Sequence, residues 1–145
     1  MLELKDFEAA ADRLKNVIHN IPLSTSCTFS AMTGAEVYLK YENQQKTGSF
    51  KVRGAYNKIM KRFAEGDLHA VVASSAGNHA QGVAFAATAA GVKSTIVMPR
   101  SAPIAKVSAT QATVPRLFWR ATFTMKPMPS VRDLRGDRRR VHPPV

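Results

Sequence analysis

One lysine stands in a stretch whose residue types could support covalent chemistry, "KTGSFKVRGA" at residues 46–55. Lys51 falls in the first turn of a helix expected after Ser49, a possible N-cap. An amine near the positive end of the helix dipole, partly desolvated by Phe50, has its ammonium form disfavoured. The neutral amine is the nucleophile that Schiff-base chemistry with an aldehyde requires.

The alternative is that Lys51 belongs to a solvated basic face of the same helix. Lys58 and Arg62 follow it at i+7 and i+11, and so lie on the same side. Gly48 and Gly54 would let the backbone approach a flat ligand, although glycines beside a turn usually do only local conformational work. Helix geometry alone leaves both interpretations of Lys51 open.

A second group of polar residues, "SSAGNHAQG" at 74–82, occupies a strand-to-helix turn. In open α/β sheets ligands bind at the carboxyl ends of strands, where backbone N–H groups can hold an anion or carboxylate. Asn78 can both donate and accept a hydrogen bond, which suits a phenolic oxygen or a carboxylate. The alternative is that Ser74, Ser75 and Asn78 cap the following helix. His79 is either a structural hydrogen-bonding residue or a general base.

Composition excludes several classes of protein. The sequence has neither a phosphate-loop lysine pattern nor G-x-G-x-x-G, and it has no Cys and His cluster at zinc spacing. The single cysteine, Cys27, permits no internal disulfide, which fits a reducing compartment. No signal-like segment opens the chain, and its longest nearly apolar run, "GVAFAATAAGV", is too short to cross a bilayer. We therefore expect a cytoplasmic protein of one modest domain with no membrane partner.

Charge and composition shift near Thr110. Of the formal net charge of +11, residues 110–145 contribute +6, together with five of the eight prolines. This tail is expected to be a disordered charged segment. The alternative, from a different functional class, is a small basic module whose tail contacts RNA through arginines interleaved with aromatic residues: Arg116, Arg120, Arg138, Arg139 and Arg140 with Phe118 and Trp119.

Before Thr110 the pattern alternates helices and strands. Helices are expected from Asp6 to before Pro22, after Ser49, and over 78–90, where Gly91 supplies a left-handed cap. Strands are expected at "EVYLKYE", "AVVAS" and "STIVMP". Because parallel neighbours need crossover connections, the order predicts an α/β fold with a parallel sheet and helices on both faces.

Three motifs in this order, "KYENQQKTGSFKVRGA", "SSAGNHAQGVA" and "MPRSAPIAKVSAT", resemble a known family. They are similar to the N-terminal part of the threonine/serine dehydratases, which are fold-type II pyridoxal-phosphate enzymes with a fold like the tryptophan synthase β subunit. The resemblance runs from about residue 5 to Thr110. It implies a division into residues 1–110, part of a catalytic domain, and 111–145, a non-homologous basic tail.

The resemblance also implies a role for each matching residue. Lys51 would form the Schiff base with pyridoxal 5′-phosphate and then move protons at the substrate Cα, Phe50 would pack on the ring, and Asn78 would hydrogen-bond the 3′ oxygen. The substrate carboxylate would be received by the loop of Ser75, Ala76, Gly77, Asn78 and His79. The implied reaction removes water and ammonia from L-threonine or L-serine, giving 2-oxobutanoate or pyruvate.

The chain also departs from the family. Members are more than twice as long and are expected to form homo-oligomers, and their phosphate-binding glycine loop lies beyond Thr110, where no equivalent occurs. We therefore expect the chain alone to be inactive or nearly so. A threonine synthase or a serine racemase is the nearest alternative, but serine racemases carry a serine where Ala76 stands.

The tail is also predicted to be a frameshift product. Residues 112–129 admit codons that, read one base earlier, translate as the family-like "GYGAEVILAGDVYDEAYA". Residues 134–145 likewise admit a family-like translation one base later. The nucleotide sequence across codons 105–145 would decide whether the tail is a genuine extension.

Overall fold

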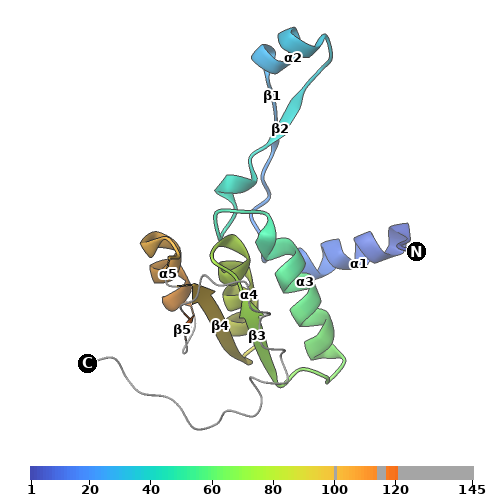
Figure 1. Ribbon diagram of the computed structural model, residues 1–145. Coiled ribbons are helices and arrows are strands. Elements are labelled where there is room, and N and C mark those ends of the chain that lie inside the picture. The colour runs from blue at the N-terminus through green and yellow to red at the C-terminus, as the bar shows by residue number, and fades with distance from the viewer. Residues whose placement is uncertain (100, 114–116, 121–145) are drawn as a thin grey trace.

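The computed structural model describes residues 1–99, 101–113 and 117–120 of the chain. Figure 1 shows an α/β body from which a narrow arm projects. The body contains α1 (Leu4–Leu14), α3 (Lys51–Ala64), β3 (Ala70–Ser74), α4 (Asn78–Ala89), β4 (Lys93–Pro99), α5 (Ile104–Gln111) and β5 (Leu117–Arg120). The arm contains β1 (Leu23–Thr25), α2 (Cys27–Thr33) and β2 (Tyr38–Lys40), and a short 3₁₀ helix, η1 (Glu42–Gln44), connects it to α3.

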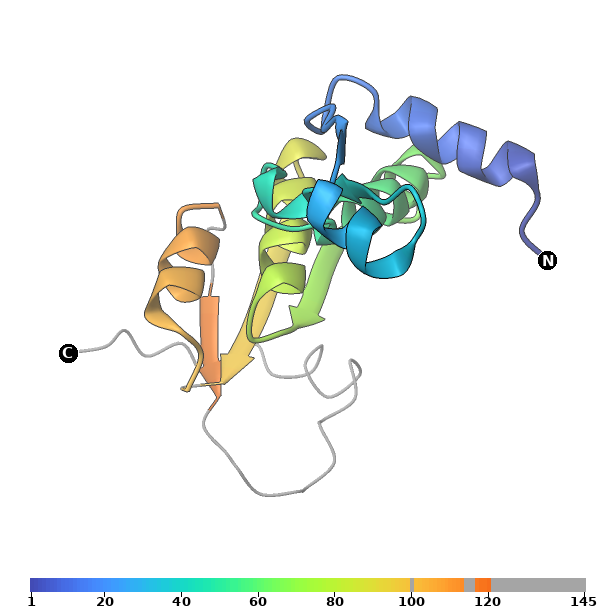
Figure 2. The ribbon, with the colours of Figure 1, turned by 90° about the horizontal axis from the view of Figure 1, so that it is seen from above.

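The sheet of the body is parallel, with strand order β3-β4-β5. Ala70 pairs with Lys93 and Ile96 pairs with Leu117. The connections β3-α4-β4 and β4-α5-β5 advance in the same direction across the sheet. Because such crossovers are right-handed, α4 and α5 lie on the same face. Figure 2 shows these two helices side by side. The predicted α/β class with a parallel sheet is confirmed.

The core lies between this face and the helices. Along β4 the buried residues alternate, and Ile96 and Met98 are fully buried. They meet the alanine-rich side of α4, while α3 packs against α4 through Ala55 and Ile59. In the described residues, α4 packs on β3 and β4, and Val72 on the other face of the sheet is 38% exposed.

Most predicted elements have close counterparts. β3 coincides with "AVVAS", α4 begins at Asn78, and Gly91 adopts a left-handed φ of 67° after the end of α4. The first helix begins earlier than Asp6, because Glu3 caps it and the Glu3 N–H donates to Asp6 Oδ2 at 2.8 Å.

The C-terminal prediction needs one correction. Residues 117–120, assigned to a disordered tail, form β5 along the free edge of β4. "LFWR" contains strong strand formers, and an open parallel edge gives their backbone partners. Residues 114–116 and 121–145 lie outside the described residues, and the frameshift and RNA-binding predictions depend mainly on them.

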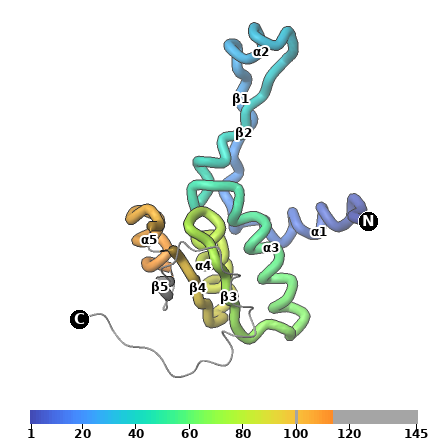
Figure 3. Tube along the Cα trace, viewed as in Figure 1, coloured from blue at the N-terminus to red at the C-terminus, as the bar shows by residue number. Residues whose placement is uncertain are grey.

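The arm is an antiparallel pair of short strands closed by a helix. Leu23 pairs with Lys40 across the pair, Ser26 caps α2, and Gly34 ends it at a left-handed φ of 70°. Figure 3 shows the arm extending from the body as a single projection. Its large apolar side chains are exposed: Leu23, Phe29, Met32 and Tyr38.

Candidate active site

The predicted lysine and asparagine motifs meet where α3 packs against α4. A Cβ atom added at Gly82 would lie 3.1 Å from the backbone oxygen of Lys51 and 3.2 Å from the Val52 nitrogen. Any larger residue would require the α3 backbone to move by a few tenths of an ångström. Because Gly82 follows Asn78 by one helical turn, the first turn of α3 lies beside the beginning of α4. The structure thus brings Lys51 close to the second motif.

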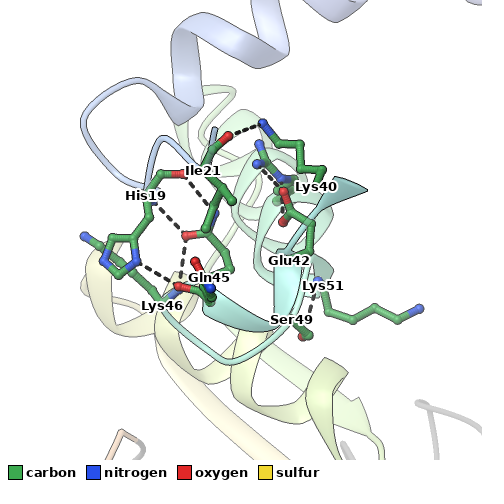
Figure 4. Close-up of polar contacts among 10 residues, drawn as sticks. His19, Ile21, Lys40, Glu42, Gln45, Lys46, Ser49 and Lys51 are labelled. Carbon is green, nitrogen blue, oxygen red and sulfur yellow. Dashed lines mark hydrogen bonds and ion pairs between the residues drawn. The ribbon is translucent and has the colours of Figure 1, made fainter. Parts of the chain in front are cut away.

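Lys51 is the first residue of α3, and its backbone N–H donates to Ser49 Oγ at 3.4 Å. Phe50, rather than the predicted Ser49, holds the N-cap position. The Lys51 side chain is exposed and extends away from the neighbouring polar cluster, as Figure 4 shows. Its Nζ lies 5.0 Å from the centroid of the Phe50 ring, in a cation–π contact.

The predicted desolvation of Lys51 by Phe50 is not present, because Lys51 is itself exposed, as is the Phe50 side chain beside it. Neither of the two glycines considered in this motif makes a close approach within the described residues. A Cβ at Gly48 or Gly54 would meet nothing within 4 Å, and Gly48 serves a turn with φ of 66°. Gly48 therefore has a local conformational role, and the approach of a flat ligand to either glycine stays a prediction.

A buried side-chain amide holds the loop that precedes Lys51. Gln45 is 3% exposed, and its Oε1 accepts hydrogen bonds from the backbone N–H groups of His19, at 2.7 Å, and Lys46, at 3.0 Å. Its Nε2 donates to the His19 carbonyl at 3.0 Å. Figure 4 shows this amide between the two segments. Gln45 therefore connects the loop to a segment 26 residues earlier.

An ion pair clamps η1 to the first turn of α3. Arg53 Nη2 donates to Glu42 Oε1 at 2.6 Å, and Nε donates to Oε2 at 3.0 Å. This two-pronged hydrogen bond lowers the pKa of Glu42 below its usual range and raises the pKa of Arg53. Sequence reasoning missed both Gln45 and this pair, since each depends on tertiary contact.

The second motif forms an open loop after β3. The Ser75 N–H donates to the Val97 carbonyl at 3.0 Å, and Ser75 Oγ accepts from the Gly77 N–H at 3.3 Å. Gly77 holds the N-cap position of α4 without a side-chain cap, so the capping alternative for Ser74, Ser75 and Asn78 is not observed. Ala76 and His79 are both exposed.

Asn78, the first residue of α4, has a partner that the sequence analysis did not predict. Lys106 of α5 donates from Nζ to Asn78 Oδ1. Its Cδ would lie 3.9 Å from a Cβ added at Gly77. A signal was available: the carboxyl ends of β3 and β4 meet at one sheet edge, so residues following β4 should lie beside those following β3.

Together these features define a class: an α/β protein whose open site, at the carboxyl ends of parallel strands, presents a primary amine, an aromatic ring and an amide. A family profile described as "pyridoxal-phosphate dependent enzyme" matches residues 14–116. The chain belongs to this family.

The relatives are similar over most of this chain. The L-threonine ammonia-lyase of Thermotoga maritima is 55% identical over 111 residues, which cover 77% of this chain and 28% of the relative. The L-threo-3-hydroxyaspartate ammonia-lyase of Pseudomonas sp is 52% identical, over 73% of this chain and 33% of the relative. The structure of maize serine racemase superposes with a TM-score of 0.75 at 35% identity, over 83% of this chain and 37% of that one. The chain thus spans about a third of the length of these proteins.

The residues present fit the aldehyde end of pyridoxal phosphate. The exposed amine of Lys51 is accessible to a carbonyl carbon, and the Phe50 ring beside it offers an apolar face. The Asn78 Nδ2 group can donate to a phenolic oxygen, since its Oδ1 is already occupied by Lys106. Within the described residues no cluster of His, Cys, Asp or Glu could hold a metal ion. None of the described helices is long and apolar enough to span a membrane.

Proposed function

We propose that this chain carries the lysine-bearing part of a pyridoxal-phosphate-dependent ammonia-lyase that acts on L-threonine or L-serine. The observation that carries the proposal is the contact at Gly82, which sets Lys51 beside the Asn78 loop. The ammonia-lyase relatives support the reaction class.

Each residue has a defined task in this function. Lys51 Nζ would hold the aldehyde carbon of the cofactor, and the same amine would accept the proton from the substrate Cα. Phe50 packs on the ring, and Asn78 Nδ2 donates to the ring's phenolic oxygen. The loop from Ser75 to His79 would hold the substrate carboxylate near the positive end of α4. Its donors would be the loop N–H groups other than those of Ser75 and Gly77, which already donate to the Val97 carbonyl and to Ser75 Oγ. When bound, pyridoxal phosphate would withdraw electrons from Cα, so that the β-hydroxyl could leave as water, and water would then hydrolyse the resulting enamine to the 2-oxo acid and ammonia.

A racemase is the second candidate, favoured by the similarity to maize serine racemase. Racemisation needs a proton donor on the face of the substrate opposite the lysine. Ala76 stands exposed in the loop and has no proton to exchange. Elimination is therefore the reaction that this loop supports better.

A chimera tests the reaction. The matched segment of the Thermotoga maritima relative would be replaced by that of this chain, and release of 2-oxobutanoate from L-threonine and of pyruvate from L-serine would be measured. We expect turnover, with a loss of at least roughly a hundredfold in Lys51→Ala and none in the control Lys58→Ala. A chimera that binds the cofactor and releases no ammonia would contradict the proposal.

A further inference from the structure

Lys106 is a charged side chain to which the proposed reaction gives no task, yet it lies over the loop from Ser75 to His79. Its Nζ donates to Asn78 Oδ1. Its aliphatic stem crosses Gly77, where a Cβ would come within 3.9 Å of Cδ. It is half-buried, whereas Lys58 and Lys93 are exposed. A merely solvated lysine would share the environment of those two residues.

The turn of α5 that carries Lys106 is fixed by hydrogen bonds and by a core contact. The buried hydroxyl of Thr110 donates to the Lys106 carbonyl at 2.8 Å, and Val107, 6% exposed, anchors the same turn in the core. The Lys106 N–H donates to the Pro103 carbonyl at 2.9 Å. The side chain is therefore delivered to Asn78 from a fixed point on α5.

A lysine partner decides which way the asparagine amide faces. An ammonium group only donates hydrogen bonds, so it selects the amide oxygen and would oppose the amide nitrogen. The first turn of α4 carries no acidic residue that could compete for the ammonium. With Oδ1 occupied, the Nδ2 group is the face of Asn78 that remains for a ligand, and it can only donate.

We infer that Lys106 is a positioning residue that fixes the Asn78 amide so that Nδ2 is presented to the phenolic oxygen of the cofactor. The inference rests on the proposed function for the identity of the ligand. The hold of Lys106 on the amide does not depend on the ligand, and the mobility of the amide can be measured without it.

The first experiment measures how firmly the Asn78 amide is held in the full chain, because a heteronuclear NOE reports the mobility of an N–H bond. Asparagine side chains are labelled with ¹⁵N, and the Nδ2 resonance of Asn78 is assigned by its loss in Asn78→Asp. Its heteronuclear NOE should be high in the parent chain and in Lys106→Arg, which keeps charge and donors. In Lys106→Met, which keeps the stem over Gly77, it should fall to the value of the exposed Asn43. An unchanged NOE in Lys106→Met would overturn the inference.

The second experiment uses the cofactor itself. The full chain is incubated with pyridoxal 5′-phosphate and reduced with borohydride, and labelling at Lys51 relative to Lys58 is quantified by peptide mapping. Lys106→Met should lower this ratio roughly tenfold, as loss of a charge-assisted hydrogen bond would. Lys106→Arg and the control Lys93→Met should leave it unchanged.

A double-mutant cycle separates positioning from general stability. If Lys106 acts through Asn78, adding Lys106→Met to Asn78→Ala should cause no further loss of Lys51 labelling. A full additional loss would overturn the inference. Equal labelling of Lys51 and Lys58 in the parent chain would instead contradict the proposed function, while the NMR measurement would still decide the role of Lys106.

Discussion

At the residue scale, the candidate site depends on a few side chains whose chemistry residues of similar size would not reproduce. Lys51 offers an accessible amine, Asn78 offers an amide with one face occupied, and Ala76 offers a methyl group in the loop that precedes Asn78. The methyl group of Ala76 leads to the most direct prediction. In the proposed function, elimination is favoured over racemisation because this side chain has no exchangeable proton.

We predict that Ala76→Ser introduces racemisation. In the chimera, formation of D-serine from L-serine should rise at least about tenfold, because a hydroxyl can return a proton to the face opposite the lysine. Ala76→Val, which adds bulk without an exchangeable proton, is the control. Chiral chromatography of the products measures the outcome, and appreciable D-serine from the parent chimera would count against elimination as the native reaction.

At the element scale, the contact between α3 and α4 sets the geometry of the site. We predict that Gly82→Ala lowers the free energy of unfolding by about 1 to 3 kcal/mol, because the new methyl group meets the Lys51 and Val52 backbone at 3.1–3.2 Å. It should also lower cofactor labelling of Lys51, since the helices must separate.

Gly54→Ala is the matched control on α3. A Cβ there meets nothing within 4 Å, so the substitution should raise stability by roughly 0.5 to 1 kcal/mol through helix propensity. Urea unfolding followed by circular dichroism compares the two variants. Equal effects of the two substitutions would show that the close approach at Gly82 is not maintained in solution.

The clamp between η1 and α3 predicts a pH dependence. Hydrogen bonds from Arg53 lower the pKa of Glu42 in the folded chain, so the unfolded chain binds this proton more readily. The stabilisation is present above the usual glutamate pKa of about 4.3 and is lost as the pH falls through the lowered folded value.

We therefore expect Glu42→Gln to cost roughly 1 kcal/mol at neutral pH and to abolish this part of the acid sensitivity. Glu65→Gln, in the exposed pair with Arg62, should change stability little. Unfolding midpoints of both variants would be measured between pH 3 and 7, in steps of about one pH unit. The same acid sensitivity in Glu42→Gln would exclude the pair as its source.

The sequence predicted the elements whose pattern is local and missed those that depend on distant partners. "AVVAS" and "NHAQGVAFAATAA" have the length and composition of a buried strand and helix, and β3 and α4 match them closely. The strand β5 and the positions of Gln45 and Lys106 depend instead on an open sheet edge or on contacts across 26 and 28 residues. No periodicity encodes such contacts, although the strand order does indicate that residues following β4 lie beside those following β3.

At the scale of the whole molecule, the arm leaves apolar surface exposed. Phe29 is 47% exposed and Met32 is 75% exposed, on a segment that projects from the body. In the family that the motifs resemble, the strand within "EVYLKYE" belongs to the larger domain. The exposed apolar side chains of the arm are consistent with a surface that such a domain would cover.

We predict that the isolated chain self-associates through the arm and unfolds with weak cooperativity. A double substitution, Phe29→Ser with Met32→Ser, should reduce self-association and hydrophobic-dye binding. Phe63→Ser, at a similarly exposed position on the body, should not. Sedimentation and thermal melting provide the measurements, and a sharp, cofactor-responsive melting transition of a monomer would refute the prediction.

Because Gln45 accepts a hydrogen bond from the His19 backbone N–H, hydrogen exchange at this amide can report opening of the loop that leads to Lys51. The His19 amide hydrogen is held by Gln45 Oε1, which also holds the Lys46 N–H at the beginning of the lysine loop. Exchange of that hydrogen with solvent requires Gln45 to release it, and the same release frees the loop. The exchange rate at His19 therefore reports how often the segment leading to Lys51 opens, from a position outside the chemistry itself.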